Sequence, residues 1–110
     1  MGHDISSYNQ SGKEVGYVRF TMGDLNAALF YEVLGAEQFN ATVSGSGHFA
    51  VFSQNQMEQA LNAFKALKEN DFYPTGNRDF FQWHHAEMLK FITNGLKTAQ
   101  KEGQVKVFFG

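Results

Sequence analysis

Hydrophobic and polar residues alternate at both ends of the chain, which is typical of half-buried β-strands. Two such runs, 4–8 and 14–20, flank the turn-forming residues Asn9-Gln10-Ser11-Gly12 and predict a hairpin. The run at 104–109 alternates in the same way. Because a terminal strand needs a neighbour, we expect it to pair beside 15–20, the second arm of the hairpin.

The segment after the hairpin predicts a helix that is apolar on nearly every side. We expect Thr21 to be its N-cap, because Asp24 follows three residues later as in a capping box. Gly35 comes directly after the last apolar residue and is expected to end the helix. A helix of this kind should lie in the centre of the protein or in an interface.

Two longer amphipathic segments follow, with a short apolar strand predicted at 48–52. Ser53 and Gln56 form the capping-box pattern at the start of the first segment. The second segment predicts a long helix over 79–102, which Gly103 ends. Gly95 lies inside it and indicates either a kink or a close contact with another helix.

These elements predict a single compact α+β domain over residues 1–110. We expect a small, mostly antiparallel sheet, made of the N-terminal hairpin plus the C-terminal strand, packed against three helices. A subunit of 110 residues has little capacity to bury all the apolar helix surface. We therefore expect a homo-oligomer, most simply a dimer with the long helix or the terminal strand at the seam.

Charge and composition exclude several classes of function. The formal net charge is -2, with two basic and six acidic residues in 1–60 and seven basic and five acidic in 61–110. This balance argues against nucleic acid as a partner, since binding phosphates needs clustered Lys and Arg. The absence of cysteine excludes disulfides and thiolate chemistry. With neither a signal pattern nor a membrane-length apolar run, we expect a cytoplasmic protein without membrane contact.

The segment Trp83-His84-His85-Ala86-Glu87 is the one dense group of chemically active side chains. On a helix, His84 and Glu87 share a face, and His48 would have to come from elsewhere to complete a catalytic or metal site. The alternative is structural: His85 fills the apolar stripe while His84 pairs with Glu87 at the surface. We expect no metal and no cofactor, and these three residues remain weak catalytic candidates.

The loop Ser44-Gly45-Ser46-Gly47-His48 has the glycines that an anion-binding loop requires. Neither a following helix nor the lysine of a phosphate-binding loop accompanies it. A plain flexible turn is therefore the favoured interpretation.

Aromatic side chains gather near the start of the long helix, where Tyr73, Phe80 and Trp83 lie close in sequence to Arg78. Free helix N–H groups, a guanidinium and flat rings suit a planar or anionic ligand such as a nucleotide. A protein interface or the core would use the same residues.

We therefore expect a non-catalytic, homo-oligomeric binding protein that sequesters or senses such a ligand at these four residues. The first alternative is a regulatory or inhibitor protein that docks on a larger protein partner. The second is a small metal- or acid/base-dependent enzyme that uses His84 and Glu87.

Overall fold

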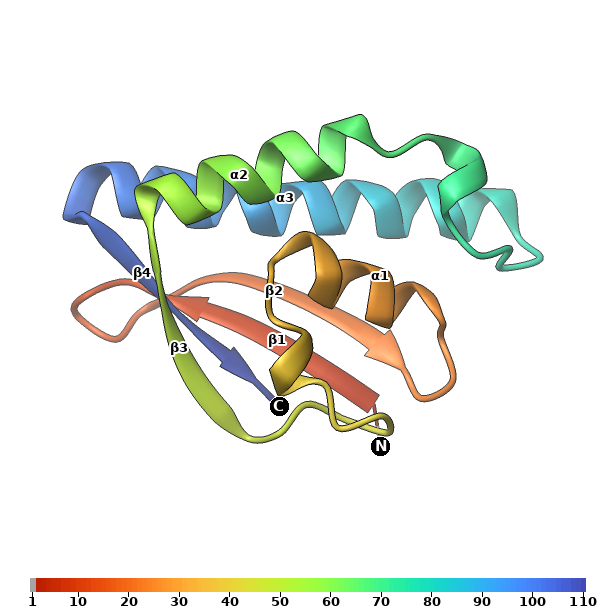
Figure 1. Ribbon diagram of the computed structural model, residues 1–110, viewed down its shortest axis with the longest axis horizontal. Coiled ribbons are helices and arrows are strands. Elements are labelled where there is room, and N and C mark those ends of the chain that lie inside the picture. The colour runs from red at the N-terminus through yellow and green to blue at the C-terminus, as the bar shows by residue number, and fades with distance from the viewer. Residues whose placement is uncertain (1) are drawn as a thin grey trace.

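The structure, a computed structural model, describes residues 2–110 and contains one antiparallel sheet covered on one face by three α-helices. In chain order the elements are β1 (Gly2–Tyr8), β2 (Glu14–Thr21), α1 (Asn26–Val33), η1 (Glu37–Phe39), β3 (His48–Ser53), α2 (Gln54–Ala66), η2 (Glu69–Asp71), α3 (Arg78–Glu102) and β4 (Gln104–Phe109). Figure 1 shows α2 and α3 side by side along one side of the molecule, with α1 below them in the view. The α+β class predicted from the sequence is confirmed.

The strands lie in the order β2-β1-β4-β3, and every neighbouring pair is antiparallel. The hairpin forms as expected, with Ile5 opposite Val18. The predicted pairing of the terminal strand beside 15–20 is wrong, because β4 joins the hairpin through β1, where Phe109 lies opposite Ile5. The burial pattern agrees with this order, because Ser6 and Ser7 of β1 are both buried, whereas exposed and buried residues alternate along much of β2.

The core lies between the inner face of the sheet and the helices. Each strand points alternate residues inward. The inward residues of β1, β2 and β4 that are almost completely buried are Ile5, Val18, Phe20, Val105, Val107 and Phe109. Phe30 of α1 contacts Phe20 of β2 and Phe91 of α3, with ring centres 5.4 Å and 5.8 Å apart. Aromatic packing thus joins the sheet to two helices.

A buried polar network fastens α1 and the loop before β3 to β1. The Nε2 atom of His3 lies 3.1 Å from the carbonyl oxygen of Thr42, and its Nδ1 atom lies 3.0 Å from the Tyr31 hydroxyl. A carbonyl only accepts, so Nε2 carries the proton and the Tyr31 hydroxyl donates to Nδ1. Burial raises the pKa of Tyr31 to about 12.

Helix α1 begins later than its sequence pattern predicts. Thr21 is the last residue of β2 and does not cap the helix; its carbonyl accepts the N–H of Asp24 at 3.0 Å in a turn. Asp24 instead accepts the N–H of Asn26 at 2.9 Å, so the turn between Thr21 and Asn26 competes with a longer helix. Gly35, with φ of 64°, ends α1 as expected.

Helix α3 has both predicted ends, within one residue, and α2 has its predicted start but ends before the expected Asn70-Asp71. Ser53 and Gln56 form the complete capping box of α2, and Gly103 ends α3 in the left-handed region. Helix α2 stops at Ala66, where Leu67 turns to extended backbone. Over residues 2–110, every helix falls short of the length and apolar character that crossing a membrane requires.

Two glycines mark close approaches of the backbone. A Cβ atom on Gly45 would lie 2.5–2.7 Å from backbone atoms of Phe109 and Gly110. A Cβ atom on Gly95 would lie 2.7 Å from the terminal methyl group of Met57, a residue of α2. This confirms the predicted close contact between Gly95 and another helix. The two sites differ because a methionine methyl can move aside and a strand backbone cannot.

We therefore expect Gly45→Ala to destabilise the protein by about 2 kcal/mol or more, through overpacking against a rigid backbone. Gly95→Ala is the matched control: Met57 can adjust and alanine favours helix, so stability should change by less than about 1 kcal/mol. Urea denaturation of both variants measures the difference. Equal losses for the two variants would contradict this account.

The pKa of Tyr31 makes a further prediction about alkaline stability. Its folded-state pKa of about 12 exceeds the ordinary tyrosine pKa of 10.0, so between these pH values the folded chain retains a proton that the unfolded chain loses. The free energy of unfolding must therefore fall as pH rises from 10 to 12. Denaturation at a series of pH values should show a smaller slope for Tyr31→Phe. Identical slopes would mean that Tyr31 ionises normally in the folded state.

Candidate functional site

Helix α3 begins with its free backbone groups already engaged. Asn77 is the N-cap, and its side chain accepts the N–H of Phe80 at 3.0 Å. Asp79 adds a negative charge to the first turn, where the helix dipole favours an anion. One of the free N–H groups at this helix end therefore already has a partner in Asn77, and Asp79 already supplies the negative charge that an anionic ligand would bring.

One buried side chain holds the loop before α3 against α1. Asn26 donates from Nδ2 to the carbonyl of Tyr73 at 3.1 Å, and its Oδ1 accepts the N–H of Tyr73 at 2.8 Å. Asn26 is buried, so these two bonds are shielded from water. This pair of hydrogen bonds places the Tyr73 loop beside the turn that follows β2.

His84 links α3 to the same turn. It is 3% exposed, and its Nε2 atom lies 2.8 Å from the carbonyl oxygen of Arg19, to which it donates. Its Nδ1 atom lies 3.8 Å from the Asp24 carboxylate. The expectation that His84 pairs with Glu87 at the surface is therefore wrong, whereas His85 packs against the Phe64, Phe72 and Phe81 rings, as the apolar-stripe interpretation expects. The two histidines project from different sides of α3: His84 points toward β2, and His85 is only partly buried.

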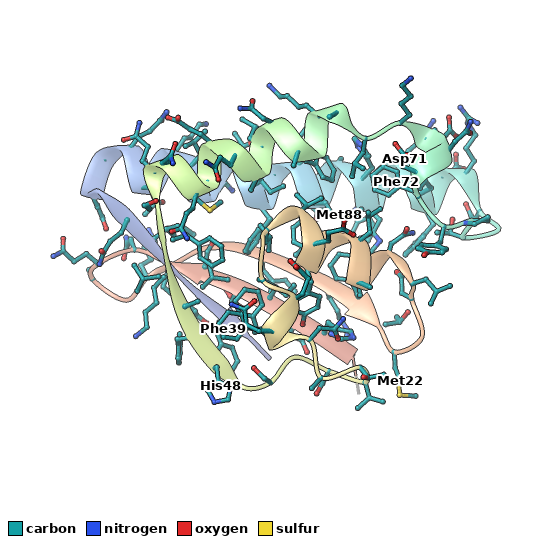
Figure 2. All side chains as sticks on the ribbon, viewed as in Figure 1. Met22, Phe39, His48, Asp71, Phe72 and Met88 are labelled. Atoms are coloured by element: carbon teal, nitrogen blue, oxygen red, sulfur yellow. The ribbon has the colours of Figure 1, made fainter. Side chains whose placement is uncertain are left out.

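The three weak catalytic candidates do not converge. His84 faces Arg19 and Asp24, whereas Glu87 borders a hollow that it shares with Tyr17 and Lys90. His48 begins β3, where its Nδ1 atom lies 2.9 Å from the Ser46 hydroxyl, and Figure 2 places it away from α3. Within residues 2–110, no three His, Asp or Glu side chains gather closely enough to hold a metal ion.

The glycine loop before β3 uses its N–H groups internally. Gly45 donates to the carbonyl of Gly110 and Gly47 donates to the carbonyl of Phe109, both at 2.7 Å. These are the groups that an anion would have to bind. The loop therefore joins β3 to the end of β4, which accounts for its glycines structurally.

Large apolar side chains gather at the N-terminal end of α3. We call them the contact surface; its members, each 40–59% exposed, are Met22, Leu25, Tyr73, Phe80 and Trp83. The rings of Phe80 and Trp83 lie 5.9 Å apart, and both pack on the His84 ring beneath them. A hollow of about 310 Å³ lies among the other members and Phe80. Figure 2 shows Met22 projecting outward from its turn.

Arg78 lies on another side of the Tyr73 loop, in a cavity of about 500 Å³ that we call the Arg78 cavity. Its apolar lining includes Phe72, Tyr73 and Phe81. The guanidinium Nη1 lies 3.4 Å from the Glu69 carboxylate, and both side chains are well exposed. An anion would compete with this carboxylate for Arg78, so the pair reduces the attraction of the cavity for anions.

A smaller hollow of about 200 Å³ adjoins the Arg78 cavity and adds Leu67 and His85 to the apolar lining. The His85 ring lies 4.8 Å from the Phe64 ring and 5.5 Å from the Phe72 ring. Burial lowers the pKa of His85, because the charged imidazolium is poorly solvated there. Burial thus favours the neutral imidazole, although the Glu69 carboxylate also lines this hollow.

The four predicted ligand-binding residues are thus divided between two sites. Tyr73 and Arg78 line the Arg78 cavity, whereas Phe80 and Trp83 lie with Tyr73 on the contact surface. Sequence reasoning missed Met22 and Leu25, although two apolar residues within a turn are themselves a signal of an exposed interface. It also missed Asn26, because the partner of its side-chain amide, Tyr73, lies 47 positions away in the sequence. A contact over such a distance leaves no pattern among neighbouring residues.

Comparison with protein-family models, with curated proteins and with solved structures gives no match to this chain. Its function must therefore be inferred from its own surfaces.

Asn26 provides a test of how the site is held. We expect Asn26→Ala to cost about 2 kcal/mol, because it leaves the N–H and carbonyl of Tyr73 without partners. Hydrogen exchange at the Tyr73 amide should accelerate at least tenfold, whereas exposed Asn62→Ala on α2 should change neither quantity. Unchanged exchange in Asn26→Ala would show that other contacts hold the loop.

Proposed function

We propose that this chain is a non-catalytic docking protein that binds a protein partner through the contact surface. The observation that carries the proposal is the exposure of five large apolar side chains at one end of the molecule. Isolated soluble proteins seldom expose a patch of this kind, and aromatic and methionine side chains are enriched at protein interfaces. This is the docking alternative expected from the sequence.

The construction of the surface supports docking. Trp83 and Phe80 rest on His84, which is fixed by its bond to the Arg19 carbonyl. Tyr73 is fixed through its backbone by Asn26. Side chains held in place lose little conformational entropy on binding, which is how interface residues with large energetic contributions act.

The charge around the contact surface favours a basic partner. Asp24 borders the hollow among Met22, Leu25 and Tyr73, and Asp79 precedes Phe80 in the first turn of α3. Arg78, the nearby cation, is already paired with Glu69. A partner segment with an apolar side chain for the hollow and lysine or arginine beside it would complement both features.

A small planar ligand in the Arg78 cavity is the second candidate. A volume of about 500 Å³ lies within the usual range for ligand sites, and three aromatic rings border it. Glu69 disfavours a highly charged anion there, so a neutral planar molecule fits this cavity better than a nucleotide does.

Two tryptophan-free model peptides test the docking proposal. Both have one helical face of leucine, and their polar faces carry either lysine or glutamate. We expect the lysine peptide to shift Trp83 emission to shorter wavelength with a dissociation constant in the micromolar range, and the glutamate peptide to bind at least tenfold more weakly. Isothermal calorimetry gives the affinities independently of fluorescence.

Variants locate the bound peptide. Phe80→Ser should weaken binding of the lysine peptide at least tenfold, and the double variant Asp24→Asn/Asp79→Asn should remove its advantage over the glutamate peptide. Val43→Ser removes an apolar side chain of similar exposure outside the contact surface and should leave binding unchanged. Binding that survives Phe80→Ser would reject the contact surface. Adenosine binding that Arg78→Ala or Tyr73→Ser weakens would favour the ligand candidate.

A further inference from the structure

The face of the sheet opposite the helices carries a second apolar surface, which we call the outer face. Its residues alternate with the core positions and include Asp4, Ser6, Tyr8, Tyr17, Arg19, Phe49, Val51, Lys106 and Phe108, with the polar residues Thr21, Ser53 and Gln104 at its margins. Tyr17, Phe49 and Val51 are each about half exposed, at 47%, 52% and 54%. An antiparallel sheet that faces water normally carries polar residues there, so this face is unusually apolar.

Strand register arranges the outer face in rows across the sheet. Ser6 lies opposite Tyr17 on one side and Phe108 on the other, and Phe108 lies opposite Phe49. From β2 to β3, the central row therefore consists of the aromatic Tyr17, the small Ser6 and the two aromatic residues Phe108 and Phe49. Ser6, which is 7% exposed, is the small side chain between two rings, and the Phe49 and Phe108 rings lie 4.7 Å apart.

The rows on either side contain the charges, and these are largely satisfied within the chain. Arg19 lies 2.7 Å from the Asp4 carboxylate, which also accepts the hydroxyl of Tyr17. Lys106 lies opposite Tyr8 and Val51, with its ammonium group 4.3 Å from the centre of the Phe49 ring. The outer face thus offers apolar area with little uncompensated charge.

We propose that the outer face binds the outer face of a second copy of this chain, about a two-fold axis parallel to the strands and between β1 and β4. This axis runs along the midline of the strand order β2-β1-β4-β3. The β1 strand of each copy therefore lies against the β4 strand of the other copy. Sheets pack face to face at about 10 Å, close to parallel. The proposal is independent of the contact surface, which lies at one end of α3.

This axis brings complementary groups together in each row. Phe108 of one copy faces the small side chain of Ser6 of the other, and Tyr17 faces Phe49 of the other copy. Lys106 faces Tyr8 of the second copy, a favourable pairing of a cation with an aromatic ring. Like charges do not oppose each other, because Arg19 and Lys106 lie in different rows. A self-complementary surface of this kind is what a two-fold interface requires.

A second copy suits the outer face better than a single-stranded nucleic acid does. Stacked bases would suit the rings, but their phosphates would need several free cations, and Arg19 is paired with Asp4. Beyond the contact surface at its N-terminal end, helix α3 offers no comparable surface, because Met88, Phe91 and Ile92 are buried against the core. Four strands of six residues span roughly 20 by 20 Å, or about 400 Å² on each copy, which is below the size of a standard stable interface, so we expect a weak dimer with a micromolar dissociation constant.

Sedimentation velocity and light scattering between 2 and 500 µM, roughly the span around such a constant, test the proposal on the full chain. We expect a reversible monomer–dimer equilibrium that changes less than twofold between 50 and 500 mM salt, about as an apolar interface should behave. Phe49→Asp should raise the dissociation constant at least a hundredfold. Circular dichroism and thermal denaturation establish that the variant folds, and Val51→Lys replaces it if it does not.

Trp83→Asp is the matched control, since Trp83 is as exposed as Phe49 and belongs to the contact surface. Trp83→Asp should abolish binding of the lysine peptide and leave the dimer intact. Phe49→Asp should disrupt the dimer and leave binding of the lysine peptide unchanged. A chain that stays monomeric to 500 µM would overturn the proposal, as would a dimer that survives both Phe49→Asp and Val51→Lys. Binding of a thymidine oligonucleotide to such a monomer would assign the outer face to nucleic acid instead.

Discussion

The pairing of β4 with both β1 and β3 is the interaction on which the rest of the structure depends. Without it, the hairpin and β3 would be separate pieces, each too small to be stable in water. With it, the inward residues of β4 complete the floor on which the helices pack. The loop before β3 reinforces this pairing, because Gly45 and Gly47 bond to the carbonyls at the end of β4. Close backbone contact, rather than ligand binding, is the role of those glycines.

The helices cover only one face of the sheet, and this determines where large apolar side chains are exposed. The helices use the inner face, so the apolar residues beyond the capacity of the core appear in two places: the outer face and the end of α3. The second of these is held by polar bonds from buried groups, with Asn26 fixing the Tyr73 loop and His84 fixing α3 to β2. The most reactive-looking residue of the sequence therefore has a structural role at the base of a binding surface.

Local patterns predicted much of the fold, and long-range contacts account for the rest. The Ser53 capping box, the hairpin and the stop at Gly103 follow from residues within a few positions of each other. The order of the strands does not, because alternation identifies a strand without identifying its neighbours. In the candidate site, residue type predicted a group of four residues around Tyr73, but which ring shares a cavity with Arg78 depends on how the Tyr73 loop is held against α1.

The register that places Ile5 opposite Phe109 also has a kinetic consequence. These strands meet only after a loop containing nearly the whole chain has closed, and such a closure loses much conformational entropy before any contact compensates it. The packing of α2 against α3 and the β1–β2 hairpin involve shorter separations and can form first. The slow event in folding should then be the insertion of β4 between two strands that are already present, with their unpaired edges exposed to other chains until it occurs.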